Sequence, residues 1–271
     1  MPIPRSLAKE TYKVEQVRAK KSLGQHFLTD ESIAERIAHS LTGRTQCLLE
    51  IGPGMGVLTK YLVGDPRYDF KAIELDRESV DYLHCNYPSL NVIEGDFLRL
   101  DLESIFGDKP FAIIGNFPYN ISSQILFRVF EQRNRVPEVV GMFQKEVAER
   151  VAAGPGSKTY GILSVLLTAF YDIEYLFTVH EHVFNPPPKV KSAVIRLTRN
   201  DTQQLGCDER LFVQVVKTGF NQRRKTLRNA LKPLNMQLDA IPDEMLAKRA
   251  EQLSVQDFIF ITNNIKPEKC Q

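Results

Sequence analysis

The segment LLEIGPGMG, at residues 48–56, decides the fold. Its apolar first half is typical of a buried strand, and its glycines are typical of a tight turn that lets the backbone approach a nucleotide-like ligand closely. A helix is expected over 55–63, and a second apolar strand over 70–75 brings Glu74 to a point 18 residues after Gly56. That separation is close to the one expected for an acid that binds a ribose. Together these features predict a nucleotide-binding α/β sheet.

The spacing of the glycines separates two kinds of nucleotide site. A dinucleotide site reads G-x-G-x-x-G, whereas here Glu50 is followed by Gly52, Gly54 and Gly56. A carboxylate at Glu50 would repel a pyrophosphate, but it would favour the cationic end of an amino acid. The pattern therefore indicates S-adenosylmethionine as the cofactor rather than NAD.

A third strand, over 90–93, leads into another acid. Asp96 is expected to accept from the adenine amino group of the cofactor, and Phe97 to lie beside that ring. One such carboxylate is more often a solvated strand end. Three acids at the ends of three successive strands, next to a glycine turn, indicate a binding site.

Residues 116–120 read NFPYN and come directly after an apolar strand over 111–115. Pro118 fixes a tight turn that presents an amide, a backbone carbonyl and an aromatic ring. The Asn116 oxygen and the Phe117 carbonyl are suited to accept both hydrogens of an exocyclic amino group, and Tyr119 to stack on the base. Two acceptors stabilise the positive charge that develops on the attacking nitrogen. The motif predicts chemistry at the amino group of adenine, with a capped strand-to-helix turn as the alternative.

Strands and helices alternate through most of the chain. Strands are expected at 47–51, 70–75, 90–93, 111–115 and 138–143, and helices at 31–41, 55–63, 77–85, 122–131 and 145–153. After a buried helix over 161–170, strands at 173–179 and 192–198 are expected to close the sheet as an antiparallel pair. This order predicts an α/β fold with a Rossmann-like, doubly wound sheet. We assign it to a catalytic domain at 1–199, beginning with a flexible segment at 1–22. Helices at 209–220, 223–231, 243–248 and 255–263 predict a small all-helical, RNA-binding domain at 208–271.

Composition is that of a soluble globular protein. Of 271 residues, 43% are apolar and 25% are charged, and the net charge of +2 says little about nucleic acids. The four cysteines have neither metal-ligand nor disulfide spacing, so we expect no metal and a reducing cytoplasm. The polar N-terminus lacks the apolar core of a signal peptide, and the longest apolar stretch, 161–170, is too short to span a bilayer. We expect no membrane partner and a monomer.

Basic residues gather in three places. Residues 211–232 hold six basic side chains and no acid, among them Arg223, Arg224, Lys225 and Arg228. The N-terminal segment holds Lys9, Lys13, Arg18, Lys20 and Lys21, and a Pro-rich loop is followed by Lys189 and Lys191. Such runs are usually solvated faces, but beside a motif that handles a base they indicate RNA contacts.

The Pro-rich loop at 184–190 joins the last two strands. A loop of this kind is usually only a spacer. Here its tip carries Phe184, which we expect to be exposed and to close over a flipped base from the face opposite Tyr119.

Together these segments resemble the ribosomal RNA adenine N6,N6-dimethyltransferases, in particular those of the small subunit. The resemblance runs through almost the whole chain and is carried by residues 21–28, 50–54, 73–76, 95–96, 116–122, 143–148, 160–161, 183–184 and 186–194. It implies a class I S-adenosylmethionine-dependent methyltransferase fold. It also implies that the cofactor site is lined by His26, Leu28, Gly52, Glu74, Asp96 and Asn116. The implied substrate is a pair of adjacent adenines near the 3′ end of small-subunit RNA, each receiving two methyl groups. One departure is Phe117, where the family often has Leu, but only its backbone carbonyl is needed.

Other functions share parts of the pattern. The methyltransferases that modify large-subunit RNA and confer macrolide resistance have the same glycine and Asn-x-Pro-Tyr motifs, but residues 184–194 and the C-terminal helices favour the small-subunit enzymes. A non-catalytic assembly factor of the small subunit is disfavoured by the intact Asn116 and Glu74. A DNA adenine methyltransferase is less expected because no target-recognition insertion is present.

Overall fold

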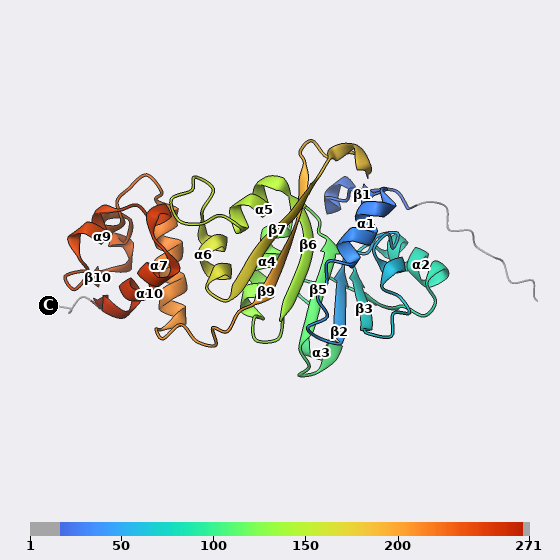
Figure 1. Cartoon of the computed structure of the whole chain (residues 1–271), viewed down its shortest axis with the longest axis horizontal. Coiled ribbons are helices and arrows are strands. Elements are labelled where there is room, and N and C mark those ends of the chain that lie inside the picture. The colour runs from blue at the N-terminus through green and yellow to red at the C-terminus, as the bar shows by residue number, and fades with distance from the viewer. Residues whose placement is uncertain (1–16, 268–271) are drawn as a thin grey trace, which may run out of the picture.

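A computed structural model, which describes residues 17–267, contains a seven-stranded sheet in the order β4-β3-β2-β5-β6-β9-β7 (Figure 1). Strands β2 to β6 pair in parallel, and β9 lies antiparallel between β6 and β7. The strands are β2 Cys47–Ile51, β3 Asp69–Glu74, β4 Asn91–Glu94, β5 Phe111–Asn116, β6 Glu138–Gln144, β7 Tyr171–Val179 and β9 Ser192–Arg199. The doubly wound α/β sheet and its antiparallel closing strands are therefore confirmed.

Apolar residues cover both faces of the sheet because neighbouring residues of a strand point to opposite sides. Leu49 and Ile113 belong to a large cluster, while Leu48 and Ile114 belong to a second cluster. Helices α3 Glu103–Phe106, α4 Ser122–Glu131, α5 Lys145–Val151 and α6 Ile162–Thr168 add side chains to the large cluster, and α1 Glu31–Ala38 adds to the second. Helix α2 Arg77–Asn86 packs its Leu83 with Ala72 of β3. The sheet is thus a central layer between two apolar layers.

The predicted helix over 55–63 is wrong. After β2 the chain forms consecutive turns and only a short 3-10 helix, η2, at Thr59–Tyr61. Gly52, Gly54 and Gly56 all have positive φ angles, of 66°, 56° and 82°. Only Gly56 lies within the expected helix, and a left-handed residue cannot be part of a right-handed helix. Beyond it the backbone makes separate helical turns, in which the Lys60 N–H donates 3.2 Å to the Gly56 carbonyl and the Val63 N–H donates 2.8 Å to the Thr59 carbonyl.

The chain before α1 runs across the carboxyl end of the sheet and is here called the strap, residues 17–28. It contains the 3-10 helix η1 Lys21–Leu23 and the short strand β1 Phe27–Leu28, which pairs antiparallel with β8 Phe184–Asn185. Val17 is buried, and the Lys20 amine binds Asp76 and, at 3.0 Å, Glu78. Residues 17–22 are therefore tied to the domain by these contacts, and the flexibility expected for 1–22 stays a prediction. Residues 1–16, with Lys9 and Lys13, lie outside the described part of the chain.

The C-terminal part is mostly helical and stands at one end of the molecule, beside α6 (Figure 1). Its helices are α7 Glu209–Asn221, α8 Leu227–Ala230, α9 Asp243–Ala247 and α10 Val255–Asn264, with 3-10 helices η4 Lys232–Leu234 and η5 Ala250–Gln252. A two-stranded ribbon, β10 Met236–Gln237 with β11 Lys266–Pro267, was not expected. The large apolar cluster continues from the sheet into α7 and α10 through Phe212 and Phe258.

The helix expected over 223–231 is much shorter. Helix α8 begins only at Leu227, after Thr226, because the Leu227 N–H donates 2.7 Å to the carbonyl of Lys248 rather than to a carbonyl one turn earlier. Arg223, Arg224 and Lys225 therefore lie in the turn before α8 and not on a helix face. Within residues 17–267 no helix combines the length and apolarity needed to cross a membrane.

Candidate active site

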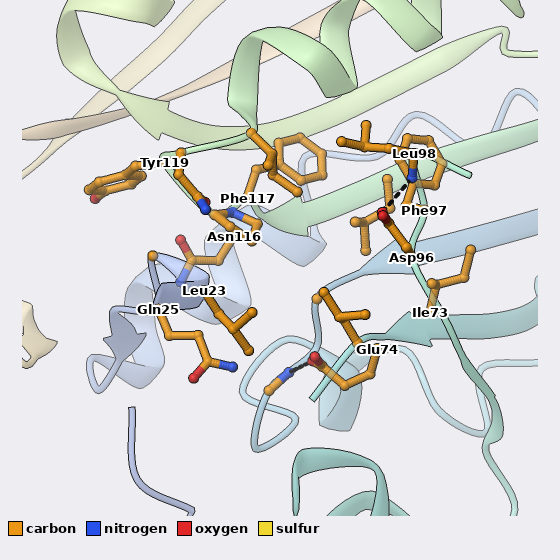
Figure 2. Close-up of a pocket in the computed structure, with 18 of the residues that line it drawn as sticks. Leu23, Gln25, Ile73, Glu74, Asp96, Phe97, Leu98, Asn116, Phe117 and Tyr119 are labelled. Carbon is orange, nitrogen blue, oxygen red and sulfur yellow. Dashed lines mark hydrogen bonds between the residues drawn. The ribbon is translucent and has the colours of Figure 1, made fainter. Parts of the chain in front are cut away.

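A pocket opens where β2, β3, β4 and β5 end, and the strap forms its other wall (Figure 2). Its empty space, counting the open solvent at its mouth, is about 900 Å³. The predicted site residues that line it are His26, Gly52, Gly54, Glu74, Asp96, Phe97, Asn116, Phe117, Pro118 and Tyr119. Motifs far apart in the sequence thus meet at one edge of the sheet, as a parallel sheet requires.

Glu74 ends β3 and is almost completely buried. Its carboxylate accepts the N–H of Gly54 at 3.0 Å and the N–H of Asp76 at 2.9 Å. Burial raises the pKa of the Glu74 carboxyl, while these N–H donors hold it down. Two backbone donors fix the carboxylate at the pocket wall, where it is able to accept from the hydroxyl groups of a ribose.

Asp96 follows β4, the strand that pairs with β3, and lines the same side of the pocket as Glu74 (Figure 2). Its Oδ1 accepts the N–H of Leu98 at 2.9 Å, which aims the carboxylate. Phe97 is buried, and Arg128 lies over its ring at 5.1 Å from the centroid. Apolar side chains that the sequence reasoning missed also line the pocket: Leu23, Ile51, Ile73, Leu75 and Leu98. Leu75 is 54% exposed. The sequence signal that could have assigned it to the pocket is its position directly after Glu74, the acid that ends β3.

Asn116, at the end of β5, has its amide orientation fixed. Its Nδ2 donates 3.0 Å to the carbonyl of His26 in the strap, and a carbonyl only accepts. The Asn116 Oδ1 must therefore be the free end of the amide. Among residues 17–267, no hydrogen-bond donor reaches this oxygen or the carbonyl oxygen of Phe117. Two consecutive residues of the pocket wall thus each carry an acceptor that has no donor among the described residues.

The Phe117 side chain points into the apolar core and not into the pocket. It is 1% exposed and packs on Phe143, with ring centroids 4.9 Å apart. Its ring lies so close to Gly115 and Gly141 that a Cβ on Gly115 would meet it at 2.7 Å. These glycines make room for the larger ring, which explains how Phe fits where the family often has Leu.

Tyr119 is held at two points. Its hydroxyl forms a hydrogen bond with Ser192 of β9, and its ring stacks on His26 with centroids 5.2 Å apart and planes 29° apart. Tyr119 and His26 also line a second, adjoining pocket together with Lys21, Gln144, Lys189 and prolines 186–188. Tyr119 therefore stands between the cofactor-type pocket and an opening with basic residues at its edge. Lys189 and Lys191 are both exposed.

Two predicted cofactor ligands do not line the pocket. Glu50 is 1% exposed and lies below the glycine turn, where the Thr59 hydroxyl donates 2.6 Å to its Oε2. Burial raises the pKa of Glu50 to about 8, which favours the neutral form of the carboxyl over the anion expected from the sequence. Leu28 is also buried, in the second apolar cluster. All five residues of β2 are buried, and Glu50 is one of them. A polar residue in this strand therefore did not indicate contact with the ligand.

Phe184 is not exposed at a loop tip, as expected from the sequence. It is 4% exposed and belongs to β8, where it pairs with Leu28 of the strap. The strap covers this part of the Pro-rich loop, a pairing that no sequence pattern predicted. In this position Phe184 packs in the second apolar cluster, and its role in stacking on a base stays a prediction.

The basic residues before and in α8 are not free of acids. Arg223 donates to the carbonyls of Lys158 and Tyr160, at 2.9 and 3.1 Å, and forms an ion pair with Glu251 at 3.2 Å. Arg228 forms an ion pair with Asp243. Arg224 and Lys225 are exposed. The acids come from later in the chain, so the absence of acids within 211–232 was misleading. Among residues 17–267, no group of three His, Cys, Asp or Glu is placed to hold a metal.

This fold, with an acid at the end of each of two neighbouring strands beside a glycine turn, defines a class I S-adenosylmethionine-dependent methyltransferase. The sequence model of the family described as ribosomal RNA adenine dimethylase matches residues 16–266. The chain belongs to this family and is an rRNA adenine methyltransferase that uses S-adenosylmethionine as methyl donor. The prediction of this cofactor over NAD is confirmed.

Individual relatives agree with the family. The chain is 61% identical to a ribosomal RNA small subunit methyltransferase A of Cytophaga hutchinsonii over 254 residues, which cover 92% of this chain and 98% of the relative. It is 58% identical to the protein of that name from Flavobacterium johnsoniae, covering 95% and 100%. Among solved structures, a dimethyladenosine transferase from Plasmodium falciparum superposes with a TM-score of 0.71 at 26% identity, covering 87% of this chain and 96% of that one. The 23S rRNA methyltransferase ErmE, at 24% identity and a TM-score of 0.65, shares the fold.

Proposed function

We propose that the chain dimethylates the 6-amino groups of two adjacent adenines near the 3′ end of small-subunit rRNA, as a step in the biogenesis of that subunit. The similarity to small-subunit enzymes over more than 90% of the chain supports this substrate. The related large-subunit enzyme is similar at the level of the fold. We further propose that the protein acts as a monomer in the cytoplasm.

One observation carries the proposal: the free Oδ1 of Asn116 beside the free carbonyl of Phe117. These two oxygens accept the hydrogens of an adenine amino group and stabilise the positive charge that grows on its nitrogen. No strong base is required, because the methylated nitrogen carries a positive charge and then loses a proton readily. Tyr119 stacks on the base and holds its plane. The methyl group comes from the sulfonium of S-adenosylmethionine.

The residues of the pocket fit this cofactor. Glu74 is placed for the ribose hydroxyls, and Asp96 for the adenine amino group of the cofactor, with Ile73, Leu75 and Phe97 as apolar surfaces. Gly52 and Gly54 have no side chains that would fill the space over the turn. The pocket that adjoins Tyr119 is the entrance for the substrate adenosine, with Lys21, Lys189 and Lys191 near the RNA phosphates.

The second methyl transfer needs a different balance of contacts. After the first transfer the amino group has one hydrogen, so Asn116 and the Phe117 carbonyl cannot both keep a hydrogen bond to it. Stacking on Tyr119 must then carry more of the orientation. Bringing the base out of an RNA helix costs a few kcal/mol unless it is already unpaired.

The test is to incubate the protein and labelled S-adenosylmethionine with under-methylated small subunits and, separately, with large subunits, and to map the methylated adenines by mass spectrometry. We expect two adjacent dimethyladenines in small-subunit RNA, and none with the Asn116→Ala variant. Label confined to large subunits would move the assignment to the macrolide-resistance type of enzyme. Tight binding to small subunits without any label would indicate a non-catalytic assembly factor.

A further inference from the structure

The side chain of His26 joins two parts of the molecule that the sequence separates by 160 residues. His26 lies in the strap directly before β1, and Pro186 follows β8, the strand with which β1 pairs. The His26 Nδ1 lies 2.8 Å from the carbonyl oxygen of Pro186. Because a carbonyl only accepts, Nδ1 must carry the hydrogen. The imidazole therefore binds the first residue of the proline run to the strap.

The same ring stacks on Tyr119, at a centroid distance of 5.2 Å. The Tyr119 hydroxyl is fixed on Ser192, so His26 is the second restraint on this ring. His26 and Tyr119, with Gly24 and Gln25, line both the cofactor pocket and the adjoining pocket. The imidazole thus stands in the wall that the two pockets share, with a proline loop on one side and the aromatic ring on the other.

The backbone around His26 is held independently of its side chain. Its carbonyl accepts from the Asn116 amide, a bond that any residue at this position keeps. Gly24 lies against Asn120, where a Cβ would come within 2.6 Å of the Asn120 Oδ1, and Thr29 donates its N–H to Val183 at 2.8 Å. Replacing the imidazole should therefore leave the strap in place and remove only the contacts of the ring.

We propose that the His26 side chain is a positioning residue for the substrate nucleotide, because it sets the distance between the Pro-rich loop and Tyr119 and so the shape of the pocket that the RNA enters. The proposal rests on the proposed role of Tyr119 in stacking on the target base. It assigns His26 a side-chain role toward the RNA, in addition to the place that its backbone has beside the cofactor. Loss of the ring leaves the prolines and Tyr119 free to move relative to each other.

Three variants separate the two contacts. His26→Asn keeps a donor for the Pro186 carbonyl but no aromatic ring, His26→Phe keeps a ring without the donor, and His26→Ala has neither. The matched control is His84→Ala, on the exposed side of α2. Steady-state methylation of small subunits gives KM for the subunit and kcat, calorimetry gives the Kd of S-adenosylmethionine, and thermal melting monitors folding.

For His26→Ala we expect KM for the subunit to rise about fivefold to tenfold, the factor that one lost hydrogen bond implies. The fall in kcat and the rise in cofactor Kd should be smaller, and the Asn and Phe variants should fall between Ala and the wild type. A wild-type KM in a folded His26→Ala protein would overturn the proposal. So would a rise in cofactor Kd as large as the rise in KM, since His26 would then be a cofactor ligand only.

A measurement on the unaltered protein guards against a variant that fails to fold. In a ¹⁵N-histidine NMR spectrum of the full chain, single replacements of the four exposed histidines, His39, His84, His180 and His182, identify their signals and leave those of His26. We expect the ring as the Nδ1–H tautomer, because the Pro186 carbonyl selects it. The Nε2–H tautomer would overturn the proposal. Failure of the proposed function would look different, because the wild type would then not methylate small subunits whatever the tautomer of His26.

Discussion

The polar groups of the cofactor pocket and the basic residues near α8 are held in different ways. In the pocket, Glu74 and Asp96 accept from backbone N–H groups, and Asn116 donates to a backbone carbonyl. Near α8, Arg228 is held by the side chain of Asp243, with exposed fractions of 50% and 90% for the two side chains. Arg223 combines both kinds of contact, because it donates to two backbone carbonyls and also forms an ion pair with the side chain of Glu251.

The difference decides how each region meets its ligand. Groups fixed by the backbone of a buried sheet stay oriented before the ligand arrives, so binding costs little reorganisation. Exposed ion pairs contribute only about 0–1 kcal/mol, so they exchange readily for other charges such as phosphates. The pocket is thus a rigid template, whereas the basic surface is an adjustable one. The following variants test this contrast.

The largest effect is expected at Glu50, the buried acid beneath the pocket. Its pKa is about 8 in the folded protein, against an ordinary value of 4.5. The folded state therefore binds the proton more tightly than the unfolded state, and the free energy of unfolding falls as pH rises from 4.5 to about 8. At about 1.4 kcal/mol per pH unit, the full loss is roughly 4–5 kcal/mol. Glu50→Gln should abolish this loss.

The measurement for Glu50 is urea unfolding of the wild type and Glu50→Gln at pH 6 and pH 9. Glu94→Gln, an exposed acid at the end of β4, serves as the control. We expect the Gln variant to gain stability over the wild type on going to pH 9. A stability difference that is the same at both pH values would mean that Glu50 does not titrate in this range.

A nearly equal effect is expected at Phe184. Because the ring is buried against the strap, Phe184→Ala should lower the free energy of unfolding by about 3–5 kcal/mol. Phe184→Leu, which keeps an apolar side chain, should cost less than about 1.5 kcal/mol and retain most methylation. Melting and activity of both variants are the readout. Loss of the second methylation in a stable Phe184→Leu protein would support the stacking role that the sequence suggested.

These two residues show where sequence reasoning reached its limit. The motifs placed Glu74, Asp96 and Asn116 correctly at one sheet edge, because alternating strands and helices determine which strand ends meet. They did not predict exposure. Glu50 and Phe184 have the residue types of ligand-binding positions, but the packing of β2 and the pairing of the strap with β8 bury both.

The fold itself was predicted well because strand periodicity is a local property, while its errors arose from non-local contacts and turn geometry. The helix expected at 55–63 is replaced by turns, and Gly56 within that range adopts a positive φ. Two of the basic residues at 223–228 form ion pairs with acids that lie later in the chain, Arg223 with Glu251 and Arg228 with Asp243. The assignment of two domains, at 1–199 and 208–271, stays a prediction.

Asn116→Ala tests the rigid pocket at the residue that we propose accepts a hydrogen bond from the target amino group. Removing one preorganised group that stabilises transition-state charge typically lowers the rate about 10²–10³-fold. We expect this loss in methyl transfer while the cofactor Kd changes little, measured by single-turnover kinetics and calorimetry. Asn86→Ala, on the exposed end of α2, is the matched control. Near-normal turnover by a folded Asn116→Ala protein would remove Asn116 from its proposed role.

Glu74→Gln should have the opposite profile. Hydrogen bonds to a charged group are worth about 1.5–3 kcal/mol, so we expect the Kd of S-adenosylmethionine to rise about 10–100-fold. The rate at saturating cofactor should change less, because Glu74 lies on β3 and the attacking amine on the side of β5. Calorimetry decides: an unchanged Kd would contradict the ribose assignment.

The smallest effects are expected at the basic residues near α8. Two double variants there compare exposed cations with cations that are held in ion pairs. Replacing Arg224 and Lys225 by Ala removes exposed charges. If both contact phosphates, the slope of log K for subunit binding against log salt should flatten by about 0.7–0.9 per lost contact, with unchanged melting. Replacing Arg223 and Arg228 should also lower the melting temperature, mainly because Arg223 ties residues 158–160 to the C-terminal part. Titration at several salt concentrations distinguishes them. An unchanged slope in the first variant would place the RNA contacts elsewhere, and Lys189 and Lys191 beside the substrate pocket would be the next to replace.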